Sequence, residues 1–136
     1  MNDKITVTVT INADAAKVWN YYTKPEHITK WNFADPSWQC PKAENDMKVG
    51  GVYFARMEAK DGSFGFDFIA NYTEIIDRKQ FTYEFGGRTA TIKIKALENQ
   101  TELEVIFDPE KENPIEMQKG GWQSILNNFK NYVETN

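Results

Sequence analysis

Apolar residues recur with two different periods near the start of the chain. They occupy every second position from 5 to 11, between threonines, which predicts a strand with one buried face. The spacing then changes to that of an amphipathic helix, with a stripe at Ala15, Val18, Trp19 and Tyr22. This helix should end about Lys24, because the residue before a proline is disfavoured in helical geometry. Pro25 suits the first position of a second short helix, which carries Ile28 and Trp31.

Five further alternating segments follow between residues 50 and 107. The first opens at Gly50-Gly51, and turn sequences separate it from its successors: Asp61-Gly62, Asp77-Arg78, Gly86-Gly87 and Glu98-Asn99-Gln100. Consecutive strands that are joined by such short turns form an antiparallel meander. Together with the first alternating segment, they predict a six-stranded antiparallel sheet.

The rest of the chain contains an irregular stretch and a final helix. Residues 32–48 have two prolines and no clear period, which predicts a loop. Asn113 and Pro114 favour a helix start, and an apolar stripe follows at Trp122, Ile125, Leu126, Phe129 and Val133. Gly120 and Gly121 indicate either a close approach or bend of this helix, or an irregular first part with the regular helix beginning near Trp122.

The order of these elements predicts one α+β domain over residues 1–136. A curved six-stranded antiparallel sheet would wrap around the long C-terminal helix, with two short helices after the first strand. A chain of 136 residues has room for a single hydrophobic core.

Charge and residue counts exclude several kinds of partner. The chain has 16 Lys+Arg against 20 Asp+Glu, a net charge of −4, and no basic run, so we expect no nucleic-acid partner. One cysteine and one histidine leave no internal disulfide and no ordinary zinc site, and we expect no metal and no cofactor. The sequence has neither a signal-peptide pattern nor the ~20-residue apolar run of a membrane span. We expect a cytoplasmic protein that is a monomer or a weak homodimer.

Small residues on the predicted inner face of the sheet indicate space beneath the last helix. These residues are Ala55, Ala59, Ala70, Ala90 and Ala96. We expect the side chains around that space to bind a ligand: Tyr53, Met57, Phe66, Phe68, Tyr72, Tyr83, Phe85, Arg88, Trp122 and Ile125. Trp31, Phe33 and Trp38 could form a lid over the cavity or seal the core permanently. The alternative is that all these rings pack on one another as core.

Several short motifs carry a resemblance to a known family. They are Val18-Trp19, Pro25-Glu26 followed by Trp31, Asp46-x-x-Val49-Gly50-Gly51, Asp61-Gly62, Tyr72-x-Glu74-Ile75 and Gly121-Trp122. In this order they resemble the SRPBCC (START-like, helix-grip) superfamily, and within it the group named after the C-terminal domain of the Hsp90 ATPase activator. The resemblance implies a curved sheet that grips the last helix around a hydrophobic cavity. Members bind lipids, plant hormones or polyketides, and some are cyclases or hydrolases.

We therefore expect a domain that binds a small hydrophobic or amphipathic molecule between the sheet and the last helix. A protein-interaction or chaperone-regulator role is the alternative, and it would use the outward-facing Phe54, Arg56 and Ile69. A cyclase or hydrolase is a third alternative, for which the sequence offers no convincing catalytic residue. Cys40 and His27 share no motif that would make them a nucleophile and its base.

Overall fold

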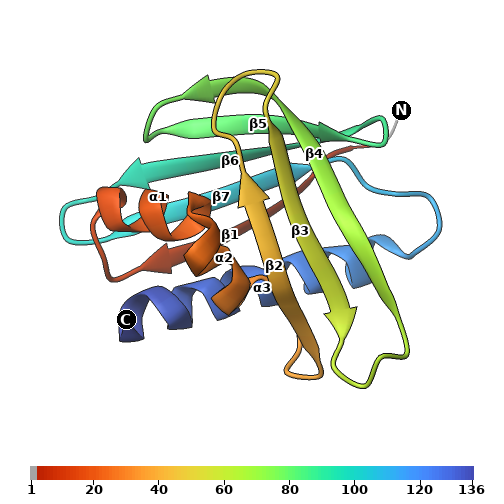
Figure 1. The fold of residues 1–136 in the computed structure, drawn as a ribbon. Helices are drawn as coiled ribbons and strands as arrows, with labels where there is room; N and C mark the ends of the chain where they lie inside the picture. The colour runs from red at the N-terminus through yellow and green to blue at the C-terminus, as the bar shows by residue number, and fades with distance from the viewer. Residues whose placement is uncertain (1–2) are drawn as a thin grey trace.

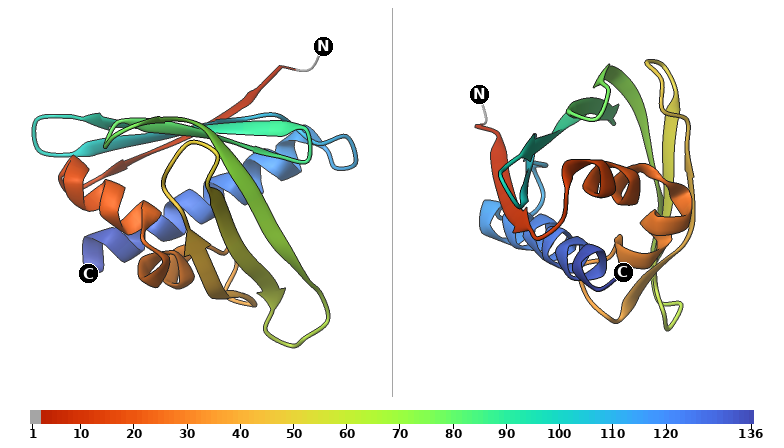
Figure 2. Two further views of the ribbon diagram at one scale, coloured as in Figure 1. Left: turned by 45° about the horizontal axis from the view of Figure 1, so that its top comes forward. Right: turned by 90° about the vertical axis from the view of Figure 1, so that its left-hand side faces the viewer.

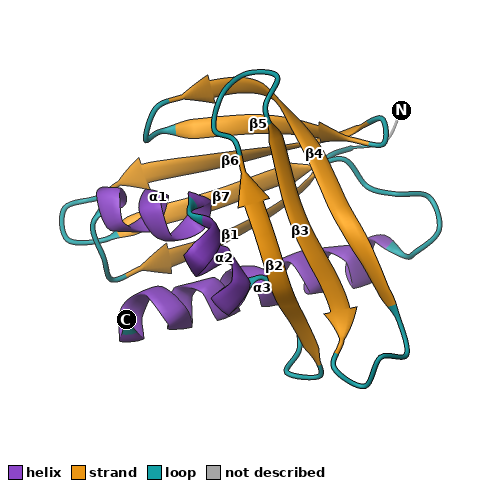
Figure 3. Ribbon diagram, in the orientation of Figure 1, coloured by secondary structure: helices purple, strands orange, loops and turns teal. Residues whose placement is uncertain are grey.

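One antiparallel sheet bends around three helices (Figure 1). The structure is a computed structural model that describes residues 3–136. Its strands are β1 (Ile5–Ile11), β2 (Trp38–Asn45), β3 (Val52–Ala59), β4 (Gly65–Ile76), β5 (Gln80–Phe85), β6 (Arg88–Ala96) and β7 (Thr101–Phe107). Its helices, which Figure 3 distinguishes by colour, are α1 (Ala15–Thr23), α2 (Pro25–Trp31) and α3 (Ile115–Thr135). The predicted α+β helix-grip architecture is confirmed.

The sheet is strongly curved, and the helices fill its concave side. The strand order is β1-β7-β6-β5-β4-β3-β2, and the two arms of the sheet enclose α1 and α2 in the right-hand view of Figure 2. The pairing of β4 with β5 shifts register between Tyr72 and Glu74, and such a bulge increases the local twist and bend of a strand. α3 lies along the open side, where it packs mainly on β1, while α2 packs on β2.

The sheet has seven strands and not the predicted six, because residues 38–45 form β2 at one edge. Pairing with β3 shifts register between Gln39 and Lys42, so that Cys40 and Pro41 interrupt the side-chain alternation. A proline is tolerated on an edge strand, since one side of that strand needs no hydrogen bonds to a neighbour. The prediction of irregular structure over residues 32–48 was wrong for these eight residues.

The core is built from rings of the helices and from the inner face of the sheet. Phe129 of α3 lies with its ring centroid 4.8 Å from that of Trp31 and 5.1 Å from that of Tyr22. All three side chains are buried, so they join α3 to α1 and α2. The predicted inward alanines are also buried, with the exception of Ala96, which is exposed.

The last helix begins where its capping residues predicted, at Ile115 directly after Pro114. Gln118 fixes this start to the preceding loop: its Oε1 accepts a hydrogen bond from the Glu110 amide at 2.8 Å, and its Nε2 donates to the Asn113 carbonyl at 2.7 Å. The helix is continuous from there, so an irregular first part up to Trp122 is excluded.

The glycines of the chain serve different purposes. A Cβ at Gly51 would collide with the carbonyl oxygen of Asp46, so only glycine fits this turn before β3. By contrast, a Cβ at Gly120 or Gly121 would meet nothing within 4 Å. Close approach of α3 to the sheet is therefore not the reason for these two glycines. No helix within residues 3–136 is long and apolar enough to cross a membrane.

Candidate ligand-binding site

An inner cavity of about 180 Å³ lies between the sheet and the helices. The structure brings eight of the predicted cavity and lid residues together around it: Trp31, Tyr53, Met57, Phe66, Phe68, Tyr83, Trp122 and Ile125. Sequence reasoning missed three more, which are Tyr22, Asn32 and Leu126. No charged side chain of the described residues lines this cavity. Its wall is aromatic and apolar, with a few polar atoms.

A second, outer space of about 440 Å³ adjoins the inner cavity. The two share the side chains of Phe66, Phe68, Trp122 and Ile125, so these four form the boundary between them. The outer groove is also lined by Ala34 of the loop after α2 and by Met117 and Gly121 of α3. It therefore lies between that loop and the beginning of α3.

The structure places Phe85 and Arg88 in this outer groove. Nε and Nη2 of Arg88 donate to the carbonyl oxygen of Asp108 at 3.1 and 2.9 Å, and its guanidinium lies 4.9 Å from the centre of the Phe85 ring. These contacts hold the side chain in place at the lining of the groove, and among the described residues Nη1 has no hydrogen-bond partner. A guanidinium in this position can bind a carboxylate.

The predicted site residue Tyr72 lines neither space. Its hydroxyl donates to Oδ1 of Asn45 at 2.6 Å, and Nδ2 of Asn45 donates to the carbonyl of Thr23 at 2.6 Å. Tyr72 therefore joins β4 through β2 to the end of α1 and serves the fold.

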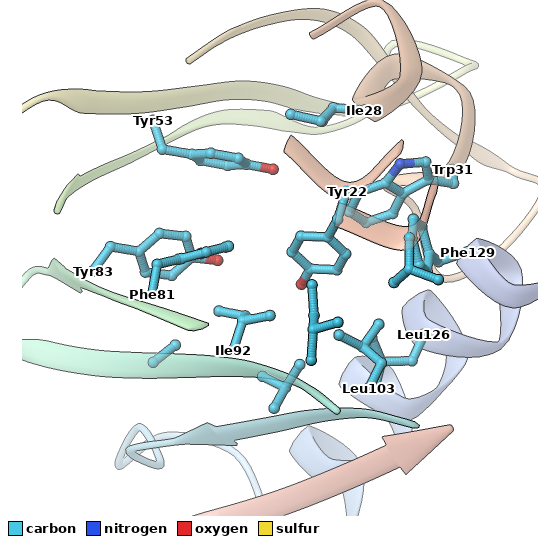
Figure 4. Close-up of a cluster of buried hydrophobic side chains, with 14 of the residues drawn as sticks. Tyr22, Ile28, Trp31, Tyr53, Phe81, Tyr83, Ile92, Leu103, Leu126 and Phe129 are labelled. Atoms are coloured by element: carbon cyan, nitrogen blue, oxygen red, sulfur yellow. The ribbon is translucent and has the colours of Figure 1, made fainter. Parts of the chain in front are cut away.

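Three tyrosine hydroxyls converge on the inner cavity. Figure 4 shows those of Tyr22, Tyr53 and Tyr83 directed toward the same space, although they come from α1, β3 and β5. The hydroxyl of Tyr53 accepts a hydrogen bond from Nδ2 of Asn32 at 3.3 Å, which leaves its own proton free. Within residues 3–136, the structure gives no hydrogen-bond partner to the hydroxyl of Tyr22 or Tyr83.

These hydroxyls stay protonated at any physiological pH. Burial raises the pKa of Tyr22, Tyr53 and Tyr83 above the ordinary value, because it disfavours the phenolate. Mutual repulsion adds to this effect, since Tyr83 raises the pKa of both Tyr22 and Tyr53. All three side chains are therefore neutral hydrogen-bond donors.

The three predicted lid residues lie in three different settings. Trp31 ends α2, is 2% exposed, and donates from Nε1 to the carbonyl of Tyr21 at 2.9 Å. Phe33 is half-buried in the loop after α2. Trp38 begins β2, so it belongs to a strand and not to an irregular loop, and its ring packs against those of Phe64 and Phe66.

Comparison with known proteins agrees with this architecture. The family model for Activator of Hsp90 ATPase homolog 1-like protein matches residues 12–134. The chain belongs to this family. An AHSA1-like protein of Aeromonas hydrophila is 31% identical, with a TM-score of 0.88 over 96% of this chain and 93% of that one. A protein of Cytophaga hutchinsonii is 44% identical, with a TM-score of 0.85 over 98% and 94%. No curated protein matches the chain.

Membership of the AHSA1-like family supports a ligand-binding or regulator-like domain in general. A protein of Chromobacterium violaceum shares the fold at 24% identity, with a TM-score of 0.85 over 98% of this chain and 99% of that one. The fold is thus kept while much of the sequence differs, and the function has to be argued from the site of each member.

The groups considered for chemistry lie outside both spaces of this AHSA1-like domain. Burial raises the pKa of the Cys40 thiol to about 11, the opposite of an activated nucleophile. His27 and Cys40 have different partners: Nδ1 of His27 lies 2.7 Å from the hydroxyl of Tyr132, and the Cys40 thiol donates to the carbonyl of Lys42 at 3.5 Å. Arg56 forms ion pairs with Glu58 and Asp67 on the outer face. Among the residues that the structure describes, no cluster of His, Cys, Asp and Glu could hold a metal ion.

Proposed function

We propose that the protein binds a small, neutral, largely apolar molecule in the inner cavity. The observation that carries this proposal is a space of about 180 Å³ enclosed by aromatic rings and lacking any charged side chain among residues 3–136. Apolar cavities of about 150 Å³ accommodate benzene, so the inner cavity suits a molecule built on a single ring. The outer groove offers room for a substituent that extends toward solvent.

Energetics favour an occupied cavity over an empty one. Each Å² of apolar ligand surface removed from water contributes about 25 cal/mol, and offset or edge-to-face ring contacts add about 0.5–1.5 kcal/mol. The rings that would make these contacts are held rigidly: the indole of Trp122 stacks on Phe107 at 4.0 Å between centroids, and Tyr53 packs on Tyr83 at 5.4 Å. A rigid, preformed site loses little entropy when it binds a ligand.

Access is through the outer groove. Phe66 is 43% exposed and lines both spaces, so a change in its rotamer would widen the connection. The loop after α2 and the first turns of α3 flank this route. Nδ2 of Asn128 in α3 donates to the carbonyl of Trp31, the last residue of α2, at 2.8 Å and so fixes the start of that loop.

NMR titration with α-methylstyrene, a neutral single-ring hydrocarbon, tests the proposal. The four tryptophans give four indole N–H signals, and only Trp31 and Trp122 line the cavity. We expect saturable shifts of these two signals, while those of Trp19 and Trp38 stay in place. A control variant, Ile125→Trp, takes up part of the cavity and should abolish or strongly reduce the shifts of the Trp31 and Trp122 signals. Absence of any shift near the solubility limit of the probe, or equal shifts of all four signals, would rule out the cavity as the binding site.

The alternative role as a protein-interaction module has weaker support. Phe54 and Ile69 lie opposite each other on β3 and β4, and Ile69 is 53% exposed. The charges beside them are already satisfied, however, because Arg56 and Asp67 pair with each other at 3.2 Å. Tyr22 and Tyr83 in the cavity have hydroxyls without a hydrogen-bond partner among the described residues. The charged groups beside Phe54 and Ile69 already have partners, so they do not require a partner protein.

A further inference from the structure

The inner cavity carries a group of hydrogen-bond donors with nothing to accept from them. Tyr22 and Tyr83 are 6% and 5% exposed, and the described part of the chain supplies no acceptor for either hydroxyl. No side-chain oxygen of residues 3–136 is both fully enclosed and unpaired, so these two open onto the cavity. Burying a hydroxyl without a partner costs roughly 1–3 kcal/mol. A ligand that fills the cavity and excludes water from it therefore has to supply an acceptor for these hydroxyls.

We propose that the hydroxyls of Tyr22 and Tyr83 bind the carbonyl oxygen of a neutral, single-ring aromatic ketone or aldehyde. This inference rests on the proposed function, and it adds the chemistry of the ligand. A carbonyl oxygen has two lone pairs and no proton, so it accepts one hydrogen bond from each tyrosine and requires no acceptor in return. Tyr53, whose proton is free because Asn32 donates to its oxygen, stands as a third donor at the same end.

Other polar groups fit this cavity less well. A carboxylate would also accept hydrogen bonds from the tyrosines. It would, however, have to leave water for a cavity whose described lining contains no cationic side chain. Burial of such an unpaired charge is strongly unfavourable. An ammonium group, the form that an alkylamine takes at neutral pH, has no lone pair to accept from the tyrosines, and it too would bury an unpaired charge. A pure hydrocarbon would fill the volume and leave the hydroxyls unpaired.

Two probes of nearly equal shape separate carbonyl recognition from simple filling of the cavity. Acetophenone and α-methylstyrene differ only in that a C=O group of the first is a C=CH₂ group in the second. Their affinities are to be measured for the wild type and for the double variant Tyr22→Phe/Tyr83→Phe. Because both hydroxyls lack protein partners, the double variant should fold at least as stably as the wild type.

We expect the double variant to bind acetophenone about 5- to 50-fold more weakly, the loss for one or two hydrogen bonds, and to bind α-methylstyrene as well as the wild type does. Tyr72→Phe is the matched control, because it removes a hydroxyl that lies on Asn45 and not in the cavity. It should leave the affinity for both probes unchanged. Benzoate, which has the same ring but is anionic, should bind more weakly than acetophenone to every variant.

Each outcome decides between the proposals. Carbonyl recognition is overturned if the double variant keeps its affinity for acetophenone, if it loses both probes equally, or if benzoate binds more tightly than acetophenone. In these cases binding of α-methylstyrene to the wild type would still support an apolar site. If neither neutral probe binds the wild type, the cavity function itself fails, and carbonyl recognition fails with it.

Discussion

Free volume beside α3 can be tested without any ligand, by filling it with a larger side chain. Ile125 is half-buried and lines both the cavity and the groove, so an indole at this position can extend into open space. A sealed void costs about 24 cal/mol per Å³, so roughly 4 kcal/mol is the upper limit for this space of about 180 Å³, which opens into the outer groove. Filling about a third of it would recover at most about 1.4 kcal/mol, less any rotamer strain. In urea unfolding followed by circular dichroism, we therefore expect Ile125→Trp to keep or raise the free energy of unfolding.

Ala70→Trp is the matched control for Ile125→Trp. The sequence pattern placed both Ala70 and Ile125 at the space beneath the last helix, but the structure places only Ile125 there. Ala70 is fully buried opposite Tyr53 in the sheet and is absent from the lining of both spaces. Its replacement overpacks the core and should lower the free energy of unfolding by about 1–3 kcal/mol or more. If Ile125→Trp proves as destabilising as Ala70→Trp, the space beside α3 is not available and the reasoning fails.

Three further predictions concern groups outside the cavity. The pKa of Asp108 is lowered, mainly by a hydrogen bond from Lys4. The ionised carboxylate therefore stabilises the fold above about pH 4, the ordinary pKa of an aspartate. This contribution is lost as the pH falls through the pKa that Asp108 has in the folded protein. Asp108→Asn should cost about 1 kcal/mol at pH 7 and flatten the loss of stability below pH 4; equal acid dependence in both proteins would contradict this. Gly120→Ala and Gly121→Ala should each raise the unfolding free energy by roughly 0.5–1 kcal/mol, because their methyl groups meet open space; a decrease at either site would mean that the helix needs the glycine. Burial of the Cys40 thiol and its pKa of about 11 predict alkylation by iodoacetamide at pH 8 far below the rate of a free thiol, and a comparable rate would show that β2 opens readily.

Most of the fold follows from periodicity, and the exceptions have local causes. Turn sequences separate β3 to β7, and each of these strands alternates over enough residues, despite the bulge in β4, to make their number and antiparallel pairing predictable. β2 escaped prediction because the register shift after Gln39 places both Cys40 and Pro41 outside the regular pairing with β3. A pattern method expects uninterrupted alternation, and a bulged edge strand does not provide it.

The site was less predictable than the fold, because its walls come from elements whose mutual placement a pattern does not contain. Tyr22 lay in the expected stripe of α1, but only the curvature of the sheet brings it to the cavity that Tyr83 also lines. Asn32 lies just after α2 and gave no signal of its own. The alanines on the inner face of the sheet suggested a space beneath α3. However, Ala70 and Ala90 are buried in the core and do not line the cavity, which larger side chains enclose.

The placement of β1 has a consequence for synthesis on the ribosome. β1 lies at an edge of the sheet with β7 as its neighbour, so that Ile5 faces Phe107, and α3 then packs across β1. A nascent chain therefore carries β1 unpaired until residues 101–107, which form β7, have emerged. Contacts between such distant segments slow folding and prolong the exposure of a strand that can pair with other chains. Truncation before residue 101 should accordingly give an aggregating product and no partially folded monomer.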